Sequence, residues 1–569
     1  MTNSVGWLQI PILSAIFVVL GAMGLEAQSP DPRLNQGPKD EAVGERVMVS
    51  TQLPLSTEAA VQVLRDGGNA VDAMITSVLH QHVIDTHQNS HFGSMSGIYY
   101  EAATGTYHVI NAVGERPLVS RCGDGDPSEV SIGGTIRGLE ALWERWGTME
   151  WEEYFEPAIR AAEDGVEVSS FMYGINSQLL ESGQIMRNSL AREIYMPDGH
   201  LVPVGDRWRI PTLAEHLRRL ASEGADYMYE GEWAERFVDE ANRRGYCVSL
   251  EDMAEYRPLW QEPVRFTYRG HELIGSPPPD TGGALVGFNL NILENFDLAG
   301  MGHYSESPET LELLARTFGR VNRETGFAIQ DPRSFQVPLD LWHSEAYGRM
   351  GAEFVRGTML RPDVSLRADS DEPYEEVAMA GPDDPWHPEE PSSNHNVIVD
   401  AEGNWFSVLH TGHGGAPGIF MEGQRTTGSS GWAYTSGPGR RIVLPITAIM
   451  ISEPGAEGPW LAMGTPGSPP QPVTQVLVNM LDFGMHPGDA ADAPRFWAFR
   501  GSGRPPSIEI EPRISDEVRR GIRESGLRIQ DLAPYYWRLG SMQIVWRDPD
   551  TGRLHGVTDA RRLGYAEGF

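Results

Sequence analysis

The chain has 569 residues and is strongly acidic, with 45 Lys and Arg against 79 Asp and Glu and a formal net charge of −34. Such a charge repels phosphate groups, so the composition argues against a nucleic-acid partner or an anionic membrane surface. The apolar fraction of 40% is ordinary for a globular protein and excludes wholesale disorder. Lys39 is the only lysine, which leaves lysine-based covalent catalysis a single candidate.

Cysteine is nearly absent. Cys122 and Cys247 are too few for a disulfide scaffold or a four-thiolate metal site. They could pair with each other in an exported protein, and two unrelated buried thiols are the alternative.

The amino terminus carries an apolar run from Ile10 to Leu25. This run is shorter than the about 20 residues that a membrane-spanning helix needs, but it suits the core of a signal peptide. We therefore expect residues 1–27 to be a signal peptide and the protein to be exported to a periplasmic or extracellular space. An uncleaved amino-terminal membrane anchor is the alternative.

Two helices are predicted after the amino-terminal linker. Pro54-Leu55-Ser56-Thr57 indicates the start of the first, with Ser56 or Thr57 as its cap, and Gly67-Gly68 ends it. Residues 69–83 then predict a second, buried helix.

The pattern next predicts a hairpin, with strands at 96–100 and 107–112 around a turn at 103–105. Apolar residues recur at helical spacing from Ile136 to Trp146, and the middle of the chain to about Gly357 is predicted to be largely helical. The acidic stretch 369–390 has no Lys or Arg and four prolines, which favours an extended, mobile segment. Short alternating strands follow it, so the pattern predicts a layered α/β protein.

The most informative stretch is a predicted hairpin with strands at 397–400 and 405–409. Ala401-Glu402-Gly403 suits a three-residue loop, with Gly403 in the left-handed conformation. If Asp400 pairs with Asn404, the residue numbers of every cross-strand pair add up to 804, and Ser393 therefore lies opposite Thr411. Opposed residues have Cβ atoms about 5 Å apart, so the two hydroxyls could interact. A hydroxyl at the end of an acidic segment, faced by a second hydroxyl, is what a self-cleaving amino-terminal nucleophile requires.

From about Gly44 to Gly568 the chain resembles a divergent γ-glutamyltranspeptidase, a family of amino-terminal-nucleophile hydrolases. The order and spacing of several segments carry this resemblance. They are Leu64-Arg65-Asp66-Gly67-Gly68-Asn69-Ala70-Val71-Asp72-Ala73, Pro157-Ala158-Ile159-Arg160-Ala161-Ala162-Glu163, Pro277-Pro278-Pro279 with Thr281-Gly282-Gly283, Val476-Leu477-Val478-Asn479-Met480-Leu481-Asp482-Phe483-Gly484-Met485, and Asp492-Ala493-Pro494-Arg495-Phe496.

The resemblance implies a precursor that cleaves itself before a hydroxyl residue. Counting back from the hairpin places Ser393 at that position, where the family has Thr, and either hydroxyl can attack an acyl carbonyl. The freed α-amine would act as general base. Thr411 matches the threonine that hydrogen-bonds the nucleophile. Gly467 and Ser468, in Gly464-Thr465-Pro466-Gly467-Ser468, match the loop whose backbone N–H groups form the oxyanion hole.

The residues that hold a glutamate substrate in the family are largely replaced. Glu115 is in register with the family's Arg-Glu pair, but Gly114 stands at the arginine position, and Arg116 is the neighbouring candidate. The family's paired serines fall within Val443-Leu444-Pro445, where no hydroxyl exists. The asparagine after the second threonine is His413. No match is found for the segment that binds the substrate's α-amine.

Each of these residues also has a purely structural interpretation. Ser393 could be a linker serine, Thr411 an ordinary strand residue, Gly467 and Ser468 a tight turn, and Arg116 a structural ion-pair partner. His80, His82, His87 and His91 invite a metal hypothesis, but no convincing ligand set accompanies them. His410 and His413 could tune proton transfer or be ordinary polar residues.

The resemblance therefore implies a four-layer αββα sandwich, split into a large subunit (28–392) and a small subunit (393–569). The expected activity is a hydrolase or acyltransferase that cleaves γ-glutamyl or related amides, with water, an amino acid or a peptide as acceptor. No organic cofactor or metal is implied. The alternatives are an acylase of the same fold with another amide substrate, and a pseudoenzyme that never cleaves itself and acts as a binding protein.

Overall fold

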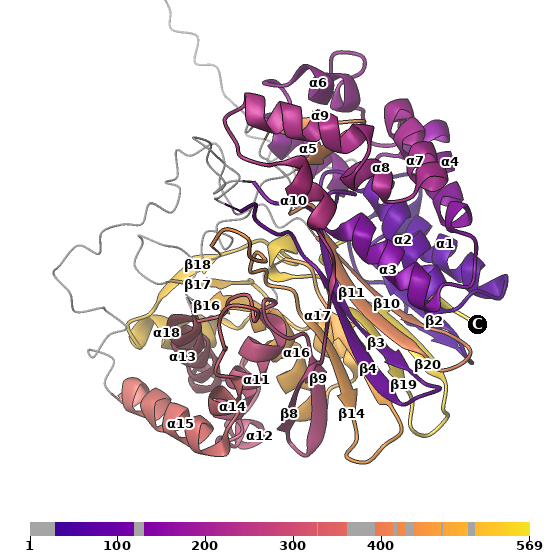
Figure 1. Cartoon of the computed structure of the whole chain (residues 1–569). Helices are drawn as coiled ribbons and strands as arrows, with labels where there is room; N and C mark the ends of the chain where they lie inside the picture. Colours follow the sequence, from indigo (N-terminus) through magenta and orange to yellow (C-terminus); the bar gives the residue numbers. More distant parts are fainter. Residues whose placement is uncertain are drawn as a thin grey trace, which may run out of the picture.

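Two seven-stranded antiparallel sheets lie face to face at the centre of the molecule, as the computed structural model in Figure 1 shows. The structure describes residues 29–118, 130–181, 183–326, 328–360, 393–413, 418–426, 437–467, 470–498 and 507–569. The predicted signal peptide (1–27), Cys122 and the acidic stretch 369–390 lie outside these ranges. Cys247 is described and is disulfide-bonded.

Each sheet combines strands from distant parts of the chain. In spatial order the first sheet consists of β21 (Tyr565–Gly568), β2 (Met48–Thr51), β10 (Asn394–Val399), β11 (Trp405–Thr411), β3 (Ser94–Glu101), β4 (Thr106–Ala112) and β7 (Leu259–Gln261). The second consists of β1 (Ala42–Gly44), β20 (Leu554–Thr558), β19 (Gln543–Arg547), β15 (Pro459–Gly464), β14 (Ala448–Ser452), β9 (His271–Gly275) and β8 (Val264–Tyr268).

Strand alternation explains the layering. Along β10, Val397 and Val399 join the apolar cluster between the sheets, which also contains Met450 of the second sheet. Ile398, between them in sequence, belongs instead to the cluster shared with the helices. Successive side chains on a strand point to opposite faces, so the half of β10 that is buried in two apolar cores, Val397 to Val399, is apolar on both faces.

One helical layer covers the outer face of the first sheet, and its side chains share a core with Ile398, Phe406 and Val408. It contains α1 (Pro54–Arg65), α2 (Ala70–Ile84), α3 (Thr135–Trp146), the 3₁₀ helix η3 (Trp151–Phe155), α4 (Glu156–Asp164), α5 (Ser170–Glu181), α6 (Ser189–Tyr195), α7 (Pro211–Glu223), α8 (Asp226–Tyr229), α9 (Glu232–Arg243) and α10 (Leu250–Glu255). Two small two-stranded sheets accompany it, β5 (Val166–Glu167) with β6 (Arg207–Trp208) and β12 (Ile419–Met421) with β13 (Gln424–Thr426).

A second helical layer covers the outer face of the second sheet. It contains α11 (Gly282–Leu293), α12 (Leu298–Met301), α13 (Pro308–Thr325), α14 (Leu339–Trp342), α15 (Glu345–Leu360), α16 (Pro470–Leu481), α17 (Pro487–Asp492) and α18 (Asp516–Glu524). A small sheet of β16 (Phe496–Ala498), β17 (Ser507–Ile510) and β18 (Arg528–Asp531) adjoins it, and two further 3₁₀ helices are η1 (Pro32–Leu34) and η5 (Trp537–Leu539). The order helix, sheet, sheet, helix confirms the predicted αββα sandwich.

The predicted caps of the first helix are wrong. Its N-cap is Leu53, with Pro54 in the first turn, and no side chain caps it. Pro54 lacks a backbone N–H, so the first turn has one donor fewer to satisfy. Ser56 and Thr57 lie one turn inside the helix and bond elsewhere, Ser56 Oγ to His80 Nδ1 at 3.1 Å. The second helix is confirmed, and Asn69 caps it in a reciprocal capping box.

The middle of the chain is less uniformly helical than predicted. It contributes the hairpin β8–β9, which completes one edge of the second sheet. The predicted hairpin at 96–112 and the helix at 136–146 are confirmed as β3–β4 and α3. Within the described ranges, no helix is long and apolar enough to cross a membrane.

Candidate active site

The β10–β11 hairpin has the predicted register. Asn394 pairs with His410 and Val399 with Trp405, so every pair between them sums to 804. Gly403 in the turn has φ +87°, in the left-handed region that glycine adopts at least cost. Continuing this register by one residue sets Ser393 opposite Thr411.

Ser393 and Thr411 lie on the hairpin face that looks toward the second sheet. His410 precedes Thr411, and its Nε2 lies 2.6 Å from Gln81 Oε1 on α2, in the helical layer. Because side chains alternate along a strand, Thr411 lies on the opposite face. The register places Ser393 on that same face.

Three hydroxyl residues thus occupy neighbouring strands at one end of the first sheet. Thr411 pairs with Ser94 of β3 on the side away from Ser393. Neighbouring strands are about 4.8 Å apart, so the backbones at the three positions span about 10 Å. Ser94 Oγ donates to the carbonyl of His413 and accepts the backbone N–H of Gly114 at 2.9 Å. The predicted nucleophile, its partner and His413 are therefore neighbours.

A buried arginine fixes the backbone at Ser393. The Ser393 side chain is 7% exposed, and its carbonyl oxygen accepts a hydrogen bond from Arg562 Nη1 at 3.0 Å. The same nitrogen donates to Gln88 Oε1 at 2.8 Å. Burial lowers the pKa of Arg562 to about 10, and the nearby carboxylate of Asp85 opposes this shift. Sequence reasoning missed Arg562, because its partners lie far away along the chain.

A polar network continues from Asn394 to the end of α2. Asn394 Nδ2 donates to Asp85 Oδ2 at 2.9 Å, and His87 Nε2 lies 2.8 Å from Asp85 Oδ1. Asp85 also accepts from the Gln88 side chain at 3.2 Å. Hydrogen bonds to a buried carboxylate restrain the groups that donate them, here the side chains of Asn394 and Gln88. The carboxylate therefore orients the residue directly after Ser393.

The loop after β15 lies beside β10. A Cβ on Gly464 would come within 2.0 Å of the His395 ring, so glycine is required for this close approach. Gly467 has φ +92°, which again favours glycine. Ser468 lies outside the described residues. The oxyanion roles of Gly467 and Ser468 stay predictions.

The histidines of the hairpin are buried and neutral at physiological pH. Burial lowers the pKa of His395 and of His410 to about 3. Burial, and then the charge of Arg425, lowers the pKa of His413 to about 4. An imidazole with so low a pKa is not charged near pH 7, so any contribution to proton transfer would come from the neutral ring.

Two arginines that sequence reasoning missed meet at Glu115. Arg333 Nη2 lies 2.7 Å from Glu115 Oε2, and Arg441 Nε lies 3.1 Å from the same oxygen. Asp331 Oδ2 contacts both arginines as well. It lies 2.5 Å from Arg333 Nη2 and accepts the backbone N–H of Arg441 at 2.8 Å. The Arg441 side chain is buried, whereas that of Arg333 is 40% exposed. Arg116 is buried at 6% exposure.

The position of the family's arginine is sterically closed. A Cβ on Gly114 would lie 2.9 Å from Ser131 Oγ and 3.2 Å from the Ile442 side chain. Leu444, where the family has serines, is 1% exposed within a small apolar cluster. Its carbonyl accepts the Thr281 N–H at 3.0 Å. Leu444 is therefore a core residue, and neither Gly114 nor Leu444 provides a polar side chain that could hold a carboxylate.

A buried carboxyl lies behind this region. Asp280 accepts Ser96 Oγ at 2.6 Å and Asn111 Nδ2 at 3.2 Å, and its backbone forms a bridge with Leu444. Burial raises the pKa of Asp280 to about 8, and the two hydrogen bonds oppose the shift. Asp280 thus joins two strands of the first sheet to the segment around Leu444. The adjacent Pro277-Pro278-Pro279 is part of the family resemblance, but no sequence pattern indicated a role for Asp280.

Among the residues that the structure describes, no group of three or more His, Cys, Asp or Glu side chains is arranged to hold a metal ion. His82 and His91 are in ring contact, with centroids 4.8 Å apart, and His82 contacts His410 at 5.2 Å. Burial lowers the pKa of both His82 and His91 well below the ordinary value.

Comparison with known proteins identifies the family. The γ-glutamyltranspeptidase family profile matches residues 56–569. A glutathione hydrolase proenzyme of Escherichia coli K12 is 24% identical over 94% of this chain and 95% of its own length. An acylase ACY 1 proenzyme of Pseudomonas sp. SE83 is 26% identical over 92% and 94%. The crystal structure of a cephalosporin acylase from Bacillus halodurans superimposes with a TM-score of 0.76, at 22% identity, over 93% and 97%.

The chain belongs to the γ-glutamyltranspeptidase family. The predicted resemblance, the αββα fold and the expectation of a γ-glutamyltransferase-like enzyme are thereby confirmed. The relatives include both glutathione hydrolases and acylases, so membership fixes the class of enzyme and leaves the acyl group of the substrate to be assigned.

Proposed function

We propose that the chain cleaves itself before Ser393 and then works as a seryl acyl-transfer enzyme on an amide substrate. The observation that carries this proposal is the β10–β11 register, which sets Ser393 opposite Thr411 on the face toward the second sheet. The buried contact between Arg562 and the Ser393 carbonyl supports it, because a nucleophile needs a fixed backbone.

Self-cleavage begins when Ser393 Oγ attacks the carbonyl carbon of Ser392. The peptide C–N bond breaks, the α-amine of Ser393 is freed, and the resulting ester is hydrolysed by water. The products are a large subunit (28–392, once the signal peptide is removed) and a small subunit (393–569). A free α-amine has a pKa of about 7.7–8.0 and serves as a base near neutral pH.

In turnover, Ser393 Oγ attacks the substrate's amide carbonyl while the α-amine of Ser393 takes the hydroxyl proton. That proton passes to the leaving amine as the C–N bond breaks, and an acyl ester remains on Ser393. Water, an amino acid or a peptide then attacks the ester and releases the acyl group. Thr411 orients the nucleophile, and the N–H groups of Gly467 and Ser468 stabilise the oxyanion.

A denaturing gel of the purified protein tests the first step. We expect fragments of about 40 and about 20 kDa in place of the 62.9 kDa chain. Ser393→Ala should remain intact and inactive, whereas Ser393→Thr should still cleave because it keeps the hydroxyl. Ser392→Ala is the matched control and should cleave normally. Amino-terminal sequencing should begin the small fragment at Ser393. A folded chain that stays whole would refute the proposal and favour the pseudoenzyme.

An acylase acting on a non-glutamyl amide is the second candidate. The tight packing at Gly114 and the buried, apolar Leu444 favour it, because neither residue offers a charged contact to a glutamyl α-carboxylate. Glu115 and Arg116, with His413, would line the acyl site in either case. Hydrolysis rates of γ-glutamyl and simple N-acyl anilides by the cleaved enzyme distinguish the two. Faster release from the N-acyl anilides supports the acylase, and the reverse supports a γ-glutamyl enzyme.

A further inference from the structure

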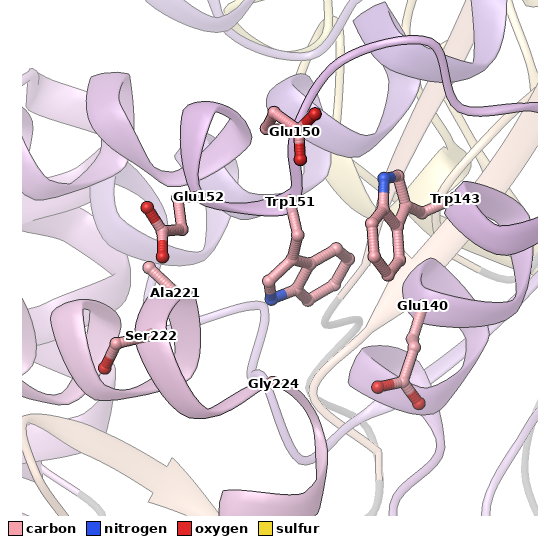
Figure 2. A pocket seen from close by; sticks show the side chains of 8 residues that line it. All are labelled: Glu140, Trp143, Glu150, Trp151, Glu152, Ala221, Ser222 and Gly224. Atoms are coloured by element: carbon pink, nitrogen blue, oxygen red, sulfur yellow. The ribbon is translucent and has the colours of Figure 1, made fainter.

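A separate cavity lies among α3, η3 and α7 in the first helical layer, and Figure 2 shows the side chains around it. Its volume is about 340 Å³, within the range of pockets that bind small molecules. Two tryptophans and three glutamates dominate the wall, and no Lys, Arg or His contributes to it. The lining residues are Glu140, Trp143, Glu150, Trp151, Glu152, Ala221, Ser222 and Gly224.

The two indole rings are held in fixed orientations. Their centroids are 5.4 Å apart and their planes are inclined by 47°. Trp143 Nε1 donates to the Met149 carbonyl at 3.0 Å, and Trp151 Nε1 donates to the Leu220 carbonyl at 3.0 Å. Both polar N–H groups are thus satisfied within the protein. Trp151 is buried at 7% exposure and Trp143 is half-buried, so Trp143 offers most of the accessible π surface, which carries partial negative charge and attracts cations.

The glutamates add negative charge around these rings. Glu140 is already bound, because Arg137 Nη1 donates to it at 2.8 Å and the Ala225 N–H donates at 3.3 Å. Glu150 and Glu152 are exposed, and neither forms an ion pair with any described residue. Glu150 is also the N-cap of η3, in a capping box with Glu153. Two carboxylates without an ion-pair partner beside an aromatic wall attract a cation and repel an anion.

We propose that this cavity binds an organic ammonium ion, of the quaternary or methylated class. A methylated ammonium is weakly hydrated, so it loses little by leaving water for an aromatic wall, and its alkyl groups pack against the rings. A small inorganic cation would gain less from the rings because it is more strongly hydrated. The combination of aromatic and acidic walls therefore selects for the organic cation.

The cavity is distinct from the candidate active site. The Thr148 N–H, in the segment between Trp143 and Trp151, donates to Asp72 Oδ1 at 2.8 Å in the first turn of α2. Ser393 lies near the other end of that helix, where Asn394 reaches Asp85. α2 has 15 residues, so the two sites are about 20 Å apart. Binding in the cavity does not depend on the proposed acyl-transfer chemistry.

Isothermal titration calorimetry of the whole protein with choline tests the proposal. The matched ligand is 3,3-dimethyl-1-butanol, which has the same shape without the charge. We expect choline to bind with a Kd on the order of 1 mM and the neutral alcohol to bind at least about tenfold more weakly. Equal binding of the two, or no binding of choline at about 10 mM, would overturn the proposal.

Variants test the aromatic and the acidic side chains of the cavity wall separately. Trp143→Leu should weaken choline binding about tenfold, while Trp260→Leu, on a tryptophan that is 39% exposed elsewhere, should leave it unchanged. The double variant Glu150→Gln, Glu152→Gln alters only surface side chains and should also weaken binding several-fold. Glu345→Gln, on the distant α15, is its control. Unchanged affinity in both cavity variants would contradict the assignment.

Discussion

The hairpin end and the Glu115 region lie at the same end of the first sheet but are built differently. At the hairpin end, the positions of Ser393 and Thr411 follow from the backbone register of β10 and β11, and Arg562 holds the Ser393 carbonyl in addition. Around Glu115, side chains from distant segments, Arg333 and Arg441, meet in a charged cluster. One region depends on strand register and the other on tertiary assembly.

This difference teaches how such an enzyme can change its substrate while keeping its chemistry. Strand register tolerates many side-chain substitutions, because backbone hydrogen bonds hold it. A charged cluster depends on each member, because removing one leaves a partner unpaired. Because backbone hydrogen bonds hold the hairpin, a change in the side chains around Glu115 affects that cluster and leaves the position of Ser393 undisturbed.

The largest effect should come from Thr411→Val. This substitution keeps the shape and β propensity of the side chain but removes the hydroxyl opposite Ser393. We expect self-cleavage and amide hydrolysis to slow about 100-fold, while the fold is retained. The rates are measured on gels and with an anilide substrate. Thr317→Val, on a buried threonine of α13, is the matched control. Normal rates in Thr411→Val would show that the hydroxyl placed opposite Ser393 by the strand register takes no part in the reaction.

A smaller and more selective effect should follow from Arg333→Met. Arg333 is the half-exposed arginine at Glu115, so we expect it to act on substrate binding and not on self-cleavage. The KM for substrates with a terminal carboxylate should rise about tenfold, with normal fragments on the gel. Arg265→Met, on an exposed ion pair of β8, should change neither quantity. Loss of self-cleavage in Arg333→Met would show that the two regions are not separable.

The last effect concerns stability instead of rate and depends on Asp280, which joins β3 and β4 to the segment around Leu444. Burial raises its pKa to about 8, so the folded state holds this proton while the unfolded state releases it near pH 4. The stability that protonation contributes is full below about pH 4 and is lost as pH rises toward 8. Asp280→Asn mimics the protonated form and should escape this loss.

Urea unfolding at pH 5, 6.5 and 8 checks the expectation for Asp280→Asn. Its stability relative to the native chain should grow with pH, by about 1 kcal/mol per pH unit. Asp516→Asn, whose side chain is 99% exposed, should show a constant difference across the same range. A constant difference in Asp280→Asn would mean that the native carboxyl is ionised throughout.

Prediction from sequence succeeded where the signal was local. The hairpin register followed from strand alternation and one glycine, and the buried helix was predicted directly after Gly67-Gly68, which end the first helix. The first helix begins at Pro54, as predicted, but the expected cap at Ser56 or Thr57 is wrong, because Pro54 is already in the first turn and Leu53 is the N-cap. Prediction also missed β8 and β9, whose place at the edge of the second sheet is decided by contacts with β14.

The sequence by itself determined the hairpin and the candidate nucleophile, because strand pairing across a tight turn joins residues within about 18 positions of one another. Only the tertiary structure decided which groups surround them. Arg562 reaches Ser393 across 169 positions, and Arg333 reaches Glu115 across 218. Such contacts leave no periodic pattern in the chain, since they exist only after the sheets and helical layers have packed.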